Sequence, residues 1–202
     1  EGDTPSKLLA WIIQKENTRP PILYLKDGND RGVYTQNEIV EVFQGHLQKI
    51  YSSQSTPAEK DIMRFLAPLQ LPKITLEDRA KLDADLSQME ILGAIESLPT
   101  RKASGSDGFP TEFYKHMAPT IALKLLDTYN EARDKGILPP TMREGHITLI
   151  LKKGQDNSDP ASYRPITVIN ADIKILCKVL ALRLKAVIQH IIHEDQCGFI
   201  PT

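Results

Sequence analysis

The spacing of apolar residues along the chain predicts mainly helices. Apolar positions three and four residues apart indicate helices over residues 7–15, 35–50, 62–66, 87–98, 119–135 and 170–192, with a shorter one at 111–115. Two of them begin with a capping box, in which a hydroxyl residue precedes a glutamate by three positions, at Thr35–Glu38 and Ser87–Glu90. Pro99 and Gly136 follow predicted helices and indicate where these end.

Two other segments predict β-hairpins. Residues 22–34 are β-prone on either side of an Asp27-Gly28 step, which supplies the positive φ that a tight turn needs. Within residues 146–164, the apolar run Ile147–Leu151 leads to two lysines and a turn at Gly154, and a second apolar run follows. The pattern as a whole therefore predicts an α+β structure.

The second hairpin brings cations to a rigid turn. Lysine is a mobile point charge, whereas the fork of arginine can bind a phosphate through two hydrogen bonds. Lys152, Lys153 and Arg164 on one hairpin therefore suit the positioning of a phosphate group. The alternative interpretation is that the two lysines are solvated turn residues.

A glycine-rich loop, Lys102–Gly108, offers a second candidate. It has two glycines beside Arg101 and Lys102, and loops of this composition can expose backbone amides to a phosphate. It is not a P-loop, because no Gly-Lys-Ser/Thr sequence follows. The alternative is an ordinary connector.

The distribution of charge favours a polyanionic partner. The net charge of the chain is −1, yet residues 143–185 contain eight basic and four acidic residues. A locally basic segment in a nearly neutral chain suits binding to a polyanion. The longest apolar runs are too short to span a membrane, so no membrane partner is expected.

The cysteines and histidines do not predict a metal site. The two cysteines have no disulfide-framework spacing, which favours reduced thiols in an intracellular compartment. His190, His193 and Cys197, with Cys177 upstream, could in principle be zinc ligands. Because Cys177 lies on the apolar face of its predicted helix, a buried structural thiol and polar histidines at the helix end are predicted instead. The sequence also lacks a persuasive pair of metal-binding carboxylates.

Several segments follow one another in the order of a known set of motifs. The segments are Leu98–Tyr114, residues 136–139, residues 147–152, residues 163–176 and residues 192–201 with their Asp-Gln-Cys-Gly-Phe sequence. In this order they resemble the motif before the fingers, the first and second fingers motifs and the following block of the reverse transcriptases of LINE-type, non-LTR retrotransposons. Residues 1–97 look like the segment between endonuclease and polymerase in these polyproteins.

The chain departs from the family pattern at two places. The family loop usually reads Pro-Gly-Pro-Asp-Gly at its centre, and Ser104 and Ser106 replace those prolines here. The family often has proline on either side of the fingers lysine, where this chain has Leu151 and Lys153.

The resemblance implies roles for the cations. It implies that Lys152 and Arg164 contact the incoming deoxynucleoside triphosphate (dNTP), and that the loop lies near the template RNA. The template or nucleic-acid contacts are expected from Arg101, Lys102, Lys153 and Lys174. The palm carboxylates that bind two Mg²⁺ ions in the complete enzyme are expected after Thr202, so no catalytic or metal-binding residue is expected in this chain.

The resemblance also implies a domain organisation. Residues 1–85 are expected to form a mostly helical connector with one β-hairpin. Residues 86–202 are expected to form the N-terminal, fingers part of a right-hand reverse transcriptase, incomplete and truncated before the palm. The implied partners are the RNA template, the DNA primer, dNTP and the polymerase palm and thumb, in the cytoplasm and nucleus.

Two other functions remain open from the sequence. The basic segment also suits a non-enzymatic remnant of a retrotransposon that binds RNA or DNA. The apolar face that a truncated helix at 170–192 would expose suits a helical protein-interaction fragment.

Overall fold

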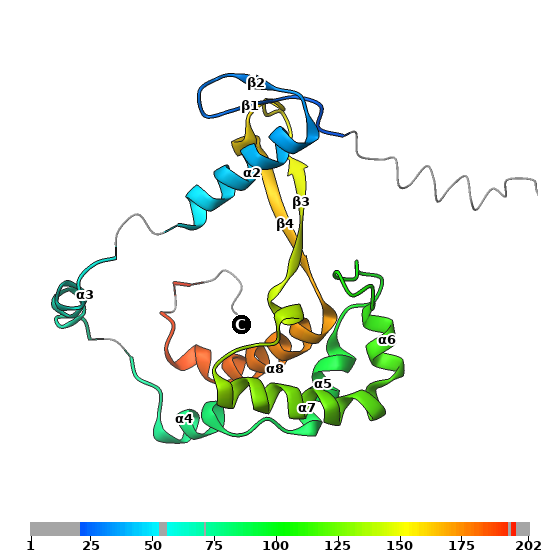
Figure 1. Cartoon of the computed structure of the whole chain (residues 1–202). Helices are drawn as coiled ribbons and strands as arrows, with labels where there is room; N and C mark the ends of the chain where they lie inside the picture. Colours follow the sequence, from blue (N-terminus) through cyan, green and yellow to red (C-terminus); the bar gives the residue numbers. More distant parts are fainter. Residues whose placement is uncertain (1–20, 53–55, 71, 194, 197–202) are drawn as a thin grey trace, which may run out of the picture. The chain divides into compact units, whose positions relative to one another are not determined.

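The computed structural model describes residues 21–52, 56–70, 72–193 and 195–196. These residues form seven α-helices and two two-stranded sheets, a mixture compatible with the predicted α+β class (Figure 1). The helix predicted over residues 7–15 lies outside the described residues. No helix among the described residues is both long enough and apolar enough to cross a membrane.

The elements belong to two compact units. Unit 1 comprises residues up to 56 together with residues 149–165, and unit 2 comprises residues 57–148 and 166–202. The hairpin of β3 (Gly145–Leu151) and β4 (Tyr163–Ile169) contributes its tip half to unit 1 and its base half to unit 2. The predicted boundary between a connector (residues 1–85) and the fingers part of a polymerase (residues 86–202) is a functional division, and it stays a prediction.

Unit 1 packs a small hairpin and one helix on the tip of the long hairpin. Its elements are β1 (Leu25–Lys26), β2 (Gly32–Val33), α2 (Gln36–Tyr51) and the 3₁₀ turn η2 (Pro160–Ser162). β1 and β2 are antiparallel, with Leu25 opposite Val33. The core consists of Leu25, Val33, Ile39 and Phe43, against which Leu149 and Tyr163 pack. The backbone N–H of Lys26 also donates to the carbonyl of Ser158 (2.8 Å), which ties β1 to the tip loop.

The predicted start of α2 is confirmed, but the predicted turn before it is wrong in one detail. Thr35 and Glu38 form both hydrogen bonds of the capping box. In the hairpin, the residue with positive φ is Asp30 (64°) rather than Gly28. The Asp27 carboxylate accepts hydrogen bonds from the N–H groups of residues 29 and 31, which makes a longer loop and moves the left-handed position to Asp30.

Unit 2 is built on three packed helices. Its α-helices are α3 (Glu59–Leu66), α4 (Leu76–Asp83), α5 (Gln88–Ser97), α6 (Thr111–His116), α7 (Ala118–Lys135) and α8 (Ala171–Val187), with 3₁₀ turns η1 (Pro140–Arg143) and η3 (Ile188–His190). α5 packs against α7 and α8 around a core of Ile91, Ala94, Ile95, Tyr114, Ala122, Leu125, Tyr129, Met142, Ala171, Ile173, Ile175 and Val179. The capping box at the start of α5 and the left-handed Gly136 (φ 66°) at the end of α7 are confirmed.

The prediction for α8 was wrong about its length and about part of its buried face. The helix ends at Val187 and gives way to η3, rather than continuing to residue 192. Ala171, Ile173, Ile175 and Val179 are its residues in the core, whereas Cys177 is exposed and Leu180 is 50% exposed. Apolar residues lie on more than one side of this helix, so their spacing alone does not show which side α5 covers.

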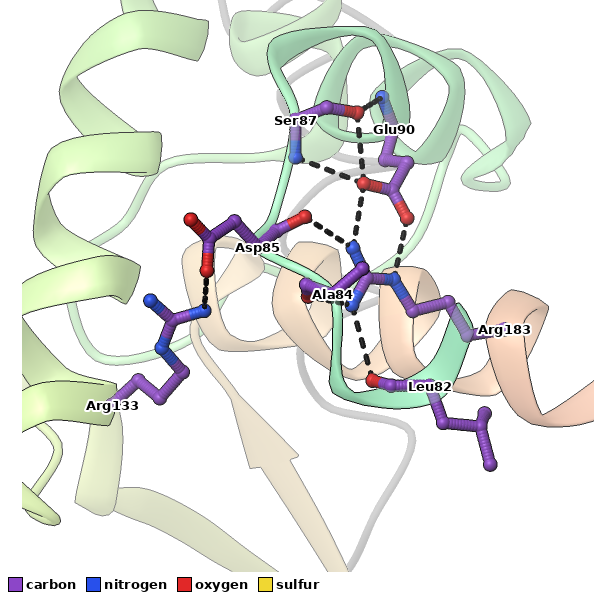
Figure 2. Close-up of polar contacts among 7 residues, drawn as sticks. All are labelled: Leu82, Ala84, Asp85, Ser87, Glu90, Arg133 and Arg183. Atoms are coloured by element: carbon purple, nitrogen blue, oxygen red, sulfur yellow. Dashed lines mark hydrogen bonds and ion pairs between the residues drawn. The ribbon is translucent and has the colours of Figure 1, made fainter. Parts of the chain in front are cut away.

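One buried guanidinium joins α8 to the segment between α4 and α5. The Arg183 side chain is only 12% exposed. Its five N–H donors reach five oxygens, two on the Glu90 carboxylate (2.6 and 2.9 Å) and three on the backbone carbonyls of Leu82, Ala84 and Asp85 (Figure 2). The same Glu90 carboxylate accepts hydrogen bonds from Ser87, so the capping box of α5 and the ion pair share one group. A charge that is removed from water is tolerated only when its donors are satisfied in this way.

We expect Arg183→Lys to lower the free energy of unfolding by about 2 kcal/mol, because lysine keeps the charge but cannot reach five acceptors from one plane. Urea unfolding of the full chain measures this change. The matched control is Arg133→Lys, since Arg133 pairs with Asp85 at the surface, where the two side chains are 46% and 85% exposed. The control should lose less than about 1 kcal/mol. Equal losses in the two variants would contradict the importance assigned to Arg183.

The Glu90 carboxylate should also make stability depend on pH. Its hydrogen bonds with Arg183 lower the pKa of Glu90 to about 2. Because the folded-state pKa lies below the unfolded value, the stabilisation is present above the unfolded pKa and is lost as pH falls from about 5 towards 2. The difference in unfolding free energy between the wild type and Glu90→Gln should therefore shrink over this range. A difference that stays constant down to the acid limit would refute this prediction.

Candidate functional site

The tip of the long hairpin carries three of the six predicted site residues. Lys152 follows the last residue of β3, and its backbone N–H donates to the carbonyl of Ser162 in η2 (2.9 Å), so a hydrogen bond still joins the two sides of the hairpin at this point. Gly154 has a positive φ of 75°, which confirms the predicted glycine turn. Arg164 is the second residue of β4. The structure thus brings Lys152, Lys153 and Arg164 together in unit 1.

Lys152 and Arg164 lie on the face of the hairpin that points away from the core of unit 1. Leu149 and Tyr163 point towards the core of unit 1, where the Tyr163 ring meets Phe43 edge to face with centroids 5.2 Å apart. Side chains alternate along a strand, so Arg164 and Lys152 lie on the opposite face of the hairpin from Tyr163 and Leu149. One face of the hairpin tip is therefore anchored and the other presents the two cations predicted to bind dNTP.

The two cations on this face keep their charge available. The Lys152 ammonium donates to the backbone carbonyl of Ala161 (2.7 Å), and Arg164 is exposed. Neither forms an ion pair with any described residue. In the tip loop, hydrogen bonds from Ser158 lower the pKa of the Asp156 carboxyl, which therefore keeps its negative charge. Cations that form no ion pair with a described residue suit an anionic ligand.

A groove of about 780 Å³ on the α2 side of unit 1 does not suit a phosphate. Neither Lys152 nor Arg164 lines it. Its walls carry more acidic than basic side chains, and the acidic ones are Asp27, Asp30, Glu38, Glu41, Asp156 and Asp159. We therefore place the candidate site on the opposite face of the hairpin.

The other three predicted residues surround the glycine-rich loop of unit 2. The Arg101 N–H donates to the Glu112 carboxylate (2.5 Å), which lowers the pKa of Glu112, and Arg101 has a positive φ of 58°. Lys102 is exposed, and the Lys174 ammonium reaches the carbonyl of Ala103 (3.4 Å). The structure therefore gathers Arg101, Lys102 and Lys174 around one loop.

The structure contradicts one of the cysteine and histidine predictions. Cys177 is exposed, so the prediction of a buried thiol was wrong, because the buried face of α8 lies elsewhere. His190 lies 3.4 Å from Asp78, and His193 lies 3.2 Å from Asp195. No group of three metal-ligating side chains occurs among the described residues, and Cys197 lies outside them.

The sequence did not single out Asn170, which is 1% exposed and hydrogen-bonds to the glycine-rich loop. An asparagine directly before a helix predicts an N-cap, yet its side chain makes no cap hydrogen bond here. No signal in the sequence pointed to its partners in this loop, which are more than 60 positions away.

Comparison with known proteins agrees with the motifs. The chain is 31% identical over 98% of its length to the Transposon TX1 uncharacterized 149 kDa protein of Xenopus laevis, of which it covers 15%. It is 30% identical over 94% of its length to the probable RNA-directed DNA polymerase from transposon BS of Drosophila melanogaster, covering 21%. It is 26% identical over 91% of its length to the RNA-directed DNA polymerase from mobile element jockey of the same species, covering 20%. No family model matches the chain.

These matches show that the chain is a homologue of the RNA-directed DNA polymerases of retrotransposons. The retrotransposons concerned are of the LINE, or non-LTR, type, as the motifs predicted. The chain spans about a fifth or less of the length of these relatives.

Proposed function

We propose that the chain acts as part of a longer RNA-directed DNA polymerase, in which it binds the incoming dNTP and the template RNA. The relatives that are named as polymerases support the reaction class. The observation that carries the assignment to this chain is the hairpin tip. Lys152 and Arg164 share the open face of a hairpin whose other face is held by the core of unit 1.

The two cations suit different parts of a triphosphate. The arginine fork binds two phosphate oxygens in a fixed plane, whereas lysine supplies a compact charge that can follow the phosphates. Phosphoryl transfer depends mainly on positioning and charge stabilisation, so cations on an anchored hairpin contribute directly. The triphosphate would lie along the open face of the hairpin, with its charge balanced by Lys152 and Arg164.

The loop cations suit the RNA backbone. Lys102 and Arg101 are exposed, and Lys174 approaches the same loop from α8. Lys153, at the hairpin turn, is exposed as well. Contacts of this kind hold a polyanion without reading its sequence, as a polymerase that copies many sequences requires.

DNA polymerases generally use Mg²⁺, which activates the primer hydroxyl and stabilises the leaving pyrophosphate. The described residues do not fit this role, because they contain no group of three His, Cys, Asp or Glu side chains that could hold a metal ion. The proposal therefore assigns metal binding and the chemical step to other residues of the polymerase, and dNTP and template binding to this chain.

In a polymerase that contains these residues, we expect Arg164→Ala to reduce kcat/KM for dNTP by at least about tenfold, or about 1.4 kcal/mol. Steady-state kinetics on a template–primer measures the effect. Arg79→Ala is the matched control, because it removes an exposed arginine whose ion pair, among the described residues, is with Asp83 of its own helix. Unchanged kinetics for Arg164→Ala would refute the role of this residue.

Template binding predicts that the chain itself has salt-dependent affinity for single-stranded RNA. With up to four phosphate contacts, from Arg101, Lys102, Lys153 and Lys174, log K against log salt should fall with a slope of roughly −3 or shallower. Fluorescence anisotropy over a series of salt concentrations measures this slope. RNA binding by the chain, combined with a lack of polymerase activity in the longer protein, would favour the alternative, a nucleic-acid-binding remnant. Absence of RNA affinity at low salt would contradict both functions.

A further inference from the structure

The glycine-rich loop of unit 2 is fastened to the start of α8 by one buried side chain. The Asn170 amide oxygen accepts hydrogen bonds from the Ser106 hydroxyl (3.2 Å) and the Asp107 N–H (3.3 Å). Its amide nitrogen donates to the carbonyl of Thr141 (3.0 Å) in η1. One side chain therefore connects three segments: the loop, η1 and the junction between β4 and α8.

The loop fits against Asn170 only because it has a glycine at the contact. A Cβ atom at position 105 would lie 2.0 Å from the Asn170 side-chain oxygen and 2.6 Å from the Asn170 backbone. Real Cβ contacts are essentially never this short, so a larger residue would force the loop away from α8. Gly105 and Asn170 are thus two sides of one contact.

Ser106 makes a contact that proline could not make. The position corresponds to a proline in the family motif that the loop resembles, and proline has no hydroxyl donor and no N–H. In this chain the Ser106 hydroxyl donates directly to Asn170. The departure from the family pattern therefore adds a hydrogen bond to the fastening.

We propose that Asn170 is a positioning residue, which holds the loop so that Arg101 and Lys102 present their charges in one fixed arrangement to the RNA backbone. This inference rests on the proposed function, because it assigns those cations to RNA. Asn170 is 1% exposed and does not touch the RNA itself. It acts through the loop, beside which the Lys174 ammonium also lies, 3.4 Å from the carbonyl of Ala103.

Because its side chain bonds to the loop and to η1, Asn170 does not cap the N-terminus of α8. At the residue before a helix, an asparagine side chain normally accepts a hydrogen bond from the first turn. Here the side chain turns away from α8 and makes no cap hydrogen bond. Asp172 instead accepts from the N–H of Ile173 in that first turn (2.6 Å). The asparagine amide is the group that fits, since it can accept from the loop and donate to η1 at once.

The first experiment measures the loop without RNA. Trypsin cuts after Arg101 and Lys102, so the rate of cleavage there reports how often the loop leaves α8. Asn170→Ala and Gly105→Ala should each raise this rate by roughly tenfold, relative to cleavage after Lys153 in the same molecule. The matched control is Tyr129→Phe, which removes a different buried hydrogen bond to the first turn of α8, that of the Tyr129 hydroxyl with the carbonyl of Asp172 (2.7 Å).

Tyr129→Phe should leave the relative cleavage rate unchanged. If it raises cleavage at Lys102 as much as Asn170→Ala does, the effect comes from general loosening of unit 2 and the inference is overturned. Unchanged cleavage in both Asn170→Ala and Gly105→Ala would overturn it as well.

The second experiment asks whether the fixed loop matters for RNA. In the full chain, Asn170→Ala should weaken binding of a single-stranded RNA by roughly threefold, with no further loss when Arg101 and Lys102 are already alanine. Additive losses would overturn the positioning role and leave the proposed function intact. If the double alanine variant binds RNA as the wild type does, the proposed RNA contact fails, and the positioning role fails with it.

Discussion

The arrangement of unit 2 depends on a buried charge that has to be fully satisfied. Arg183 is largely removed from water, and only the geometry in which all five of its N–H groups reach oxygens makes this tolerable. That requirement fixes α8 against the segment before α5 and fixes Glu90 as its counter-charge. Because α8 begins two residues after β4 ends, a fixed α8 also fixes where the base of the hairpin and the residue between them, Asn170, must lie.

The two candidate binding surfaces are supported by different physical means. At the hairpin tip, apolar packing of Tyr163 on Phe43 holds one face and leaves the other for Lys152 and Arg164. At the glycine-rich loop, the hydrogen bonds of the buried Asn170 amide hold the loop that carries Arg101 and Lys102. In both places the cations are exposed or only partly buried, while a buried side chain, Phe43 or Asn170, supports them. A flexible polyanion is bound more tightly by charges whose positions are already fixed.

Local patterns in the sequence predicted local structure well. The capping boxes at Thr35 and Ser87, the helix end at Gly136 and the turn at Gly154 were all confirmed, because each depends on residues close in sequence. The exposure of Cys177 and the contacts of Asn170 and Arg183 were not predicted, because each depends on which distant segment packs against that residue. Three of the five acceptors of Arg183 are backbone carbonyls about a hundred positions away. Every residue has such a carbonyl, so the residue types do not indicate which ones accept. The motifs predicted the family correctly, whereas the roles of single cations still depend on experiments.

The central claim is that the open face of the hairpin tip binds the triphosphate of the incoming dNTP. The most direct measurement is the rate at which an amine-selective reagent modifies Lys152 and Lys153 in a polymerase that contains them, on a template–primer, with and without the matching dNTP. Lys152 directly follows β3 and its N–H bonds to Ser162, whereas Lys153 lies in the turn, so each serves as the control for the other. The account predicts that the dNTP slows modification of Lys152 by roughly tenfold and has little effect on Lys153. Equal protection of the two lysines, or no protection of Lys152, would contradict it.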